Sequence, residues 1–338
     1  MHISAFKGIC AKGSYDFQQL QSKNQHDVVA HIAADIQAGY LERDTRECLY
    51  LYEFVDGNKS TTSLIALMNN DMFTSQRIKV HEKTVTGEEL AQAQLFQEFR
   101  LQINPVMLIF RNKKEIDQLL EKEKETSAPV IHLKAHAVEH RLYRVSDPEK
   151  IEGIVRLYHA ISSFYLADGH HRLGAINRFG GSHFMAVLVA NKDIHLHSFH
   201  KLIHLNAPVD KKDVLNKVRS QFGVRKLRNP PSDTCADVVI FFNNECYKIK
   251  PYREAEPLFV QQYLLKETFK DAQVQAVTPA QGIDYLSQAV ASNRMVGIYQ
   301  PRIQLEQILR MADGGFFVPP KSTYFEPKLP DGLISCDL

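Results

Sequence analysis

The sequence has few cysteines, and its charges are balanced. The 5 cysteines among 338 residues are scattered and form no CxxC pair. An odd, scattered set argues against a disulfide framework or a zinc site, so we expect reduced structural thiols. The 41 basic and 39 acidic side chains leave a formal net charge of +2. A nearly neutral chain has no general attraction for nucleic acid or anionic membranes, so any anion site must be built locally.

Long hydrophobic runs are also missing. The longest apolar stretches, such as 184–190 and 238–242, have the length of a strand. A membrane-spanning helix needs about 20 apolar residues, so we expect no membrane segment. Residues 1–13 have neither the basic nor the apolar region of an export signal, and we expect a cytoplasmic protein.

Helical and strand patterns alternate along the chain, which predicts a mixed α/β (α+β) fold. Periodicity and capping residues predict helices over 26–38, 87–100, 113–124 and 148–159. Thr86 and Glu89 have the spacing of a capping box for the second of these helices. Short apolar runs predict strands over 47–54, 106–110, 129–133, 163–167, 185–190 and 194–199.

A second domain is predicted to begin after Asn206-Ala207-Pro208, which divides the chain into residues 1–207 and 208–338. Its predicted elements are a helix, a hairpin, two helices, a strand and a helix, over 211–222, 236–250, 257–269, 279–290, 295–299 and 303–312. The tail, 314–338, is predicted to be irregular.

The segment 164–176 carries the most informative pattern. An apolar strand runs into Asp168-Gly169-His170-His171-Arg172, and this polar turn opens an apolar-periodic helix. Free backbone N–H groups at a helix N-terminus, beside one arginine and two histidines, form a natural phosphate cradle. The alternative is that Asp168 only caps the helix, Gly169 only makes the turn and the histidines face solvent.

Two further segments carry candidate chemistry. In 78–84, Glu82 lies between His81 and Lys83 and would serve as a general base; the alternative is a solvated loop. In 318–328, two prolines precede Lys321, Ser322 and Thr323, a set that would close over a phosphorylated ligand. An extended terminus is the alternative there. The histidines at 195, 197, 200 and 204 do not favour a metal site, because no carboxylate has matching spacing.

Together these segments resemble the domain of unknown function 1015 family, which is related to the ParB and sulfiredoxin superfamily and to free serine kinases. The resemblance rests on 78–84 (IKVHEKT), 167–172 (ADGHHR) and 319–333 (PPKSTYFEPKLPDGL), in this order along nearly the whole chain. It implies a ParB/sulfiredoxin-like nucleotide-binding domain with an N-terminal extension in 1–207. It also implies a C-terminal α/β domain whose tail returns to the site.

The resemblance further implies a kinase that transfers a phosphoryl group from ADP or ATP to a hydroxyl, most plausibly of free L-serine, with Mg²⁺ as cofactor. By its position Glu82 would be the base, while Asp168 would hold magnesium or orient the acceptor, and His170 would take part in catalysis. The nucleotide would be bound by Gly169, His170, His171, Arg172, Lys321, Ser322 and Thr323. The substrate would be bound by His81, Thr84, His200 and Lys201.

Some features depart from this family. Many members have His-Arg where this chain has His200-Lys201, and a Pro-Pro-Tyr-Asp segment is replaced by 11–16. A point charge in place of a forked donor weakens a carboxylate contact. A nucleotide-binding regulatory module with little catalysis therefore stays open as the alternative. Nucleic-acid binding is not expected, because no helix-turn-helix carries a clustered basic face. The sequence leaves the oligomeric state open.

Overall fold

The computed structural model describes residues 2–13, 15–20, 23–135, 138–232, 235–251, 257–290, 294–319 and 321–338. The chain forms two compact units. Unit 1 comprises Met1–Ile194, Leu309–Phe317 and Pro327–Leu338, and unit 2 comprises His195–Ile308 and Val318–Glu326. The change of unit at His195 comes before the predicted boundary at 207/208, because the strands that follow His195 pair within unit 2.

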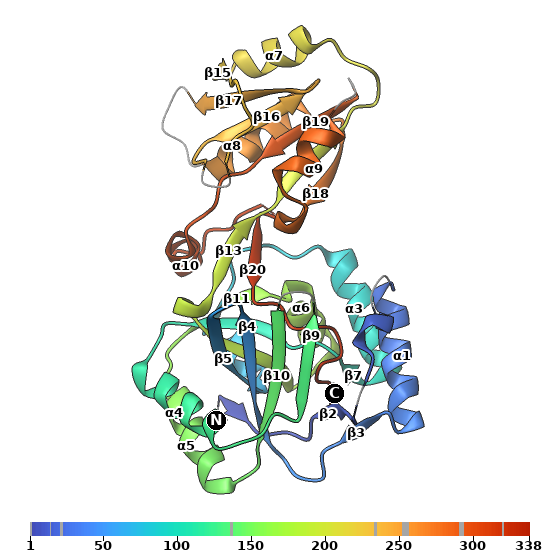
Figure 1. Ribbon diagram of the computed structural model, residues 1–338, viewed down its shortest axis with the longest axis vertical. Coiled ribbons are helices and arrows are strands. Elements are labelled where there is room, and N and C mark those ends of the chain that lie inside the picture. The colour runs from blue at the N-terminus through green and yellow to red at the C-terminus, as the bar shows by residue number, and fades with distance from the viewer. Residues whose placement is uncertain are drawn as a thin grey trace. The chain divides into compact units, whose positions relative to one another are not determined.

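Unit 1 is built on a mixed sheet, which confirms the predicted fold class (Figure 1). Its strand order is β6-β11-β8-β12-β5-β4-β10-β9, and β1 pairs with β5. The β11–β6 and β12–β8 pairs are parallel and the others are antiparallel. The strands are β1 (Ile3–Ser4), β4 (Leu49–Asp56), β5 (Lys59–Asn69), β6 (Ile78–Lys79), β8 (Val106–Phe110), β9 (Ile131–Ala135), β10 (Val138–Val145), β11 (Phe164–Asp168) and β12 (His183–Ala190).

Helices α4 and α5 pack together on one side of unit 1, and α3 packs against α6 and α1 (Figure 1). Side chains of strands and helices form one core, in which Leu108, Phe164, Ile176 and Phe184 are almost fully buried. The helices are α1 (Gln25–Ala38), α2 (Asp71–Thr74), α3 (Thr86–Phe99), α4 (Lys114–Glu125), α5 (Pro148–His159) and α6 (His170–Phe179). Two small pairs, β2 (Ile9–Ala11) with β3 (Leu41–Arg43) and β7 (Leu101–Gln102) with β21 (Cys336–Asp337), complete the unit.

Unit 2 has a sheet of order β15-β17-β16-β19-β14-β18 and a separate pair of β13 with β20. Alternating side chains fill two cores: Ile240 and Ile298 pack on one face, and Val239 and Tyr299 on the other. Its elements are β13 (His195–Ser198), β14 (His200–His204), α7 (Lys211–Arg219), β15 (Phe222–Lys226), β16 (Val238–Phe242), β17 (Glu245–Pro251), α8 (Pro257–Tyr263), the π-helix η3 (Leu264–Thr268), β18 (Gln273–Val277), η4 (Pro279–Gln281), α9 (Gly282–Ala289), β19 (Met295–Tyr299) and β20 (Thr323–Glu326). The division between the units falls within helix α10 (Leu305–Asp313), after Ile308.

The sequence predicted most of these elements to within a few residues, and α5, β8 and β19 with the same bounds. The prediction of an irregular tail was wrong in two places, because Thr323–Glu326 pairs with β13 as β20 and Cys336–Asp337 pairs with β7 as β21. Both strands are too short to show an alternating pattern, and their partners are distant in sequence. Among the described residues, no helix combines the length and the apolar character that crossing a membrane requires.

A buried carboxylate ties the sheet of unit 1 to α4. Glu53 is 5% exposed, and it accepts hydrogen bonds from Ser60 (2.8 Å), Lys124 (3.0 Å) and Tyr143 (2.8 Å), with Arg141 at 3.2 Å. Burial alone would raise the pKa of Glu53, but the hydrogen bonds from Ser60, Lys124 and Tyr143 outweigh it and lower the pKa to about 2. The ionised form therefore stabilises the folded state.

This pKa predicts how stability depends on pH. Because the folded-state pKa is below the unfolded one, the stabilisation is present above about pH 4.5 and is lost as pH falls toward 2. We expect Glu53→Gln to lower the free energy of unfolding by about 3 kcal/mol at pH 7, and by less at pH 3. Urea unfolding at both pH values measures this difference. Glu152→Gln, at an exposed position of α5, is the control, and a Glu53→Gln effect that is equal at both pH values would contradict the prediction.

Candidate functional site

The turn between β11 and α6 organises the candidate site in unit 1. Phe164, Tyr165, Leu166 and Ala167 are buried, as expected of an apolar strand inside a sheet. The pairing of β11 with β8 shifts register between Leu166 and Asp168. Such a bulge re-aims the side chain that follows it. The strand therefore ends at Asp168, where the chain leaves the sheet and enters α6.

Gly169 makes this turn possible. It is the N-cap of α6 and has a φ of 90°, in the left-handed region that side chains disfavour. A Cβ atom at this position would also lie 3.2 Å from the guanidinium of Arg172. The Asp168 side chain does not cap the helix, because Gly169 holds that position and no side-chain cap is formed. The first amides of α6 therefore have no intrahelical acceptor, as at every helix N-terminus.

Asp168 is instead the centre of a charge cluster. One carboxylate oxygen accepts from Arg172 (2.7 Å) and the other from Lys328 (2.9 Å), while Arg172 also donates to the Pro105 carbonyl (2.7 Å). Burial would raise the pKa of Asp168, but the positive charges of Arg172 and Lys328 outweigh it and lower the pKa. These residues line a cavity of 160 Å³ that Asn104 also borders.

The donor set at Asp168 does not suit a magnesium ligand. Both carboxylate oxygens already bind cationic groups, and a divalent ion would have to displace one of them. Across the described residues, no cluster of three His, Cys, Asp or Glu side chains is placed to hold a metal. Magnesium at Asp168 is therefore a sequence prediction that this arrangement does not support.

A second cavity, of 340 Å³, lies beside the same turn and contains Glu82. Strands β6 and β11 run parallel, with Ile78 opposite Phe164. The residues that follow the two strands therefore emerge at the same edge of the sheet. In this way Glu82, which follows β6, and His170, the first residue of α6, come to line one cavity.

His81 does not line this cavity, but it contacts His170, which does. Its ring is 1% exposed and meets the His170 ring edge-on, with 4.9 Å between the ring centroids. Burial, followed by the neighbouring His170, lowers the pKa of His81 to about 3, although a hydrogen bond to the backbone of Leu166 opposes the shift. The ring is therefore neutral at pH 7. We expect His81 to position His170, rather than to contact a substrate as the resemblance implied.

Glu89 is a cavity residue that the sequence reading misassigned. The predicted capping box of Thr86 and Glu89 was wrong, since α3 begins at Thr86 with Val85 as its N-cap and has no side-chain cap. Glu89 is instead 7% exposed and accepts hydrogen bonds from Thr84 and Arg178. The sequence did contain a signal for the burial of Glu89. It has helical spacing with Ala93 and Phe96, and the three residues share one buried face of α3.

The surroundings of Glu89 are tightly constrained. A Cβ atom at Gly174 would overlap the Glu89 carboxylate, so α3 and α6 approach closely at this point. Burial would raise the pKa of Glu89, but the hydrogen bonds from Thr84 and Arg178 outweigh it and lower the pKa. Thr84, a predicted substrate residue, lines the cavity while it holds this carboxylate.

Two more side chains complete the surroundings of the turn. His171, a predicted nucleotide ligand, points toward α3 and lies 3.0 Å from the Glu88 carboxylate. Phe317 was not identified from the sequence; it lines the cavity of Glu82, and the Lys83 ammonium lies 5.3 Å from its ring centroid. Phe317 is the second of two adjacent phenylalanines after Gly314-Gly315, and this pattern gives no sequence signal for its placement.

The remaining predicted site residues lie in unit 2. His200 is 7% exposed and accepts a hydrogen bond from the backbone of Gln300 (3.2 Å). The Lys201 ammonium donates to the backbone carbonyl of Lys321 (2.6 Å), and the backbone of Phe199 donates to that of Ser322 (3.3 Å). The Ser322 side chain is 1% exposed, and Thr323 begins β20. Pro320 lies outside the described residues.

The structure thus assembles the predicted residues as two groups. Glu82, Thr84, Asp168, His170 and Arg172 line the two cavities of unit 1, whereas His81, Gly169 and His171 do not. His200, Lys201 and 321–323 form a group of hydrogen-bonded or buried residues in unit 2. Their roles toward nucleotide or substrate stay predictions.

A mixed α/β fold with a strand-turn-helix junction, and with a carboxylate in the cavity beside it, is the class that the geometry defines. The chain belongs to the family described as "Protein of unknown function (DUF1015)", whose pattern matches residues 14–281. This confirms the family identified from the three sequence motifs. No curated protein matches the sequence.

Several solved structures resemble the chain distantly. Staphylococcus aureus SbnI with a C-terminal truncation has 10% identity and a TM-score of 0.49, over 79% of this chain and 85% of that one. Free serine kinase in complex with AMP has 13% identity and a TM-score of 0.47, over 81% and 91%. A variant of free serine kinase in complex with ADP has 13% identity and a TM-score of 0.47, over 84% and 92%.

The turn geometry predicts a position-specific effect of alanine. We expect Gly169→Ala to lower the free energy of unfolding by about 1–2 kcal/mol, because a left-handed alanine is strained and its methyl group contacts Arg172. Gly153→Ala in α5 is the matched control. A Cβ atom there meets nothing within 4 Å, so we expect it to stabilise the helix by about 0.5–1 kcal/mol. Urea unfolding measures both, and effects of the same sign would refute this account of the turn.

Proposed function

We propose that unit 1 carries a phosphotransferase site, which moves a phosphoryl group from ADP or ATP to the hydroxyl of a small acceptor, free L-serine. One observation carries the proposal: Glu82 and His170 line a single cavity beside the N-terminus of α6. Phosphoryl transfer requires mainly positioning and charge neutralisation, and a base near the acceptor hydroxyl. The turn at Gly169 and the cavity beside it support all three requirements.

The phosphate groups would lie at the N-terminus of α6. Backbone amides that follow Gly169 point out of the helix, and the helix dipole adds positive potential there. Arg172 keeps unused donors beside its bonds to Asp168 and Pro105, and Lys328 brings a second cation. His170 would contact the transferred group from the cavity side. These groups would neutralise the transferring phosphoryl, and no step of the proposal depends on a metal.

The acceptor would occupy the cavity that contains Glu82. In the proposed step the carboxylate takes the proton of the acceptor hydroxyl, whose oxygen bonds to the terminal phosphorus, while the bond from that phosphorus to the bridging oxygen breaks. Glu89 is a weaker candidate for the base, because its hydrogen bonds lower its pKa and occupy its oxygens. Thr84 would then fix the wall of the acceptor cavity.

The proposed base has a direct test. We expect Glu82→Gln to lower formation of O-phosphoserine from L-serine by at least about 100-fold, since general base catalysis contributes about 10²–10⁴-fold. We expect its affinity for ADP to remain near that of the unmodified protein, because the phosphate cradle does not include Glu82. Phosphoserine detection and isothermal titration calorimetry measure the two quantities.

Glu98→Gln, an exposed substitution on α3, is the matched control and should retain full activity. Loss of both turnover and ADP binding in folded Glu82→Gln protein would move Glu82 from catalysis to binding. If the unmodified protein binds nucleotide but phosphorylates no hydroxy amino acid, a nucleotide-responsive regulatory module replaces the kinase.

A further inference from the structure

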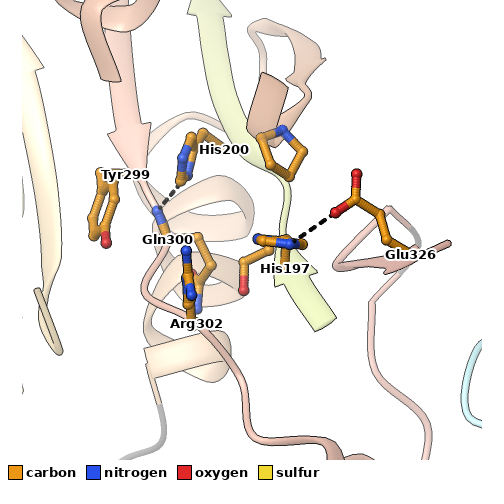
Figure 2. Close-up of a pocket in the computed structure, with 8 residues that line it drawn as sticks. His197, His200, Tyr299, Gln300, Arg302 and Glu326 are labelled. Carbon is orange, nitrogen blue, oxygen red and sulfur yellow. Dashed lines mark hydrogen bonds and ion pairs between the residues drawn. The ribbon is translucent and has the colours of Figure 1, made fainter. Parts of the chain in front are cut away.

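A separate polar pocket lies within unit 2 (Figure 2). Its volume is 240 Å³, below the range of about 300–1,000 Å³ that is usual for drug-sized ligands, so it suits a small molecule. The lining side chains come from β13, β14, η4, β20, the end of β19 and the residues that follow it. Those that matter for binding are His197, His200, Tyr299, Gln300, Arg302 and Glu326.

Gln300 is the unusual member of this pocket. The residue is 1% exposed, yet its side-chain oxygen and nitrogen have no hydrogen-bond partner among the described residues. A buried amide without partners is costly, and buried polar groups in folded proteins nearly always have them. Because Gln300 lines the pocket, a ligand that both donates and accepts a hydrogen bond would satisfy it.

Arg302 supplies a positive charge two residues further along the chain. Its side chain is exposed, and within the part of the chain that the structure describes it forms no ion pair. An arginine at the mouth of a polar pocket is suited to a carboxylate or phosphate, which it can bind with two parallel hydrogen bonds. The ligand that complements this pocket is therefore an anion.

The other walls are held in place by interactions within unit 2. The His200 ring stacks on Tyr299 at 4.8 Å between centroids. Because its Nδ1 accepts from the Gln300 backbone, the neutral ring carries its proton on Nε2. On another side the His197 imidazole lies 3.1 Å from the Glu326 carboxylate (Figure 2). This pair links β13 to β20 and places two polar side chains on this side of the pocket.

We propose that this pocket binds a small organic anion that carries a hydroxyl or amine beside its charged group. The anion pairs with Arg302, and the neighbouring hydroxyl or amine exchanges hydrogen bonds with the Gln300 amide. The proposal goes beyond the phosphotransferase function of unit 1 and does not depend on it, because every residue involved belongs to unit 2.

The test uses the full chain without nucleotide. Glycolate and glycine represent carboxylates, and sn-glycerol 3-phosphate represents a phosphate ester, so the probes distinguish the two kinds of anion. Calorimetry and ligand-observed NMR report binding independently of any kinase activity. We expect at least one probe to bind, and Arg302→Gln to weaken it by about 10- to 100-fold, the usual worth of a hydrogen bond to a charged group.

Gln300→Met gives a second readout that a merely structural residue would not give. It should weaken the same probe, and it should raise the melting temperature of the free protein, because an unpartnered buried amide is replaced by an apolar side chain of similar size. Arg225→Gln is the matched control, since it removes the same charge from β15, at the far edge of the sheet of unit 2 from β14. It should bind the probe as the unmodified protein does.

Weaker binding in both pocket variants, with binding retained by Arg225→Gln, supports the site. Several results would overturn it: no probe binds, binding survives either pocket substitution, Arg225→Gln weakens it equally, or Gln300→Met lowers the melting temperature.

Discussion

The left-handed turn at Gly169 is the constraint on which the site of unit 1 depends. The bulge before it and the helix after it force Asp168 and His170 to opposite sides of the turn. Asp168 therefore lines the smaller cavity with its two cations, and His170 lines the larger one with Glu82. A single residue with positive φ thus separates the cavity of Asp168, Arg172 and Lys328 from the cavity of Glu82. Both regions share the N-terminus of α6, so a ligand that binds its amides is close to both.

Three carboxylates of unit 1 are held by several donors each. Glu53, Asp168 and Glu89 all bind cationic or hydroxyl donors, and all have a lowered pKa. A carboxylate in such an environment stays ionised and is a weak base. These three therefore organise structure: Glu53 ties α4 to the sheet, Glu89 fixes α3 against α6, and Asp168 orients Arg172. In the proposed reaction Glu82 takes the proton, because it lines the cavity proposed for the acceptor.

The local features of the fold could be predicted from the sequence. The apolar strand, the glycine and the polar turn at 164–172 are neighbours in the chain, and the structure places them as the pattern indicated. Long-range features could not be predicted. The ion pair of Asp168 and Lys328 joins residues 160 positions apart, and Arg178 reaches Glu89 across 89 positions. Nothing in local periodicity encodes these distances, so Glu89 was read as a helix cap when its role is set by tertiary packing.

Residues 335–337 bind three other parts of unit 1. β21 pairs with β7, Arg43 binds Asp337, and Ser335 exchanges backbone hydrogen bonds with Ile9. These partners lie between Ile9 and Gln102. The last segment of unit 2, by contrast, ends at Glu326. During synthesis on a ribosome, unit 2 therefore has all its residues before unit 1 does. Lys328 follows Glu326, so the ion pair of Lys328 with Asp168 forms only after every residue of unit 2 has been made.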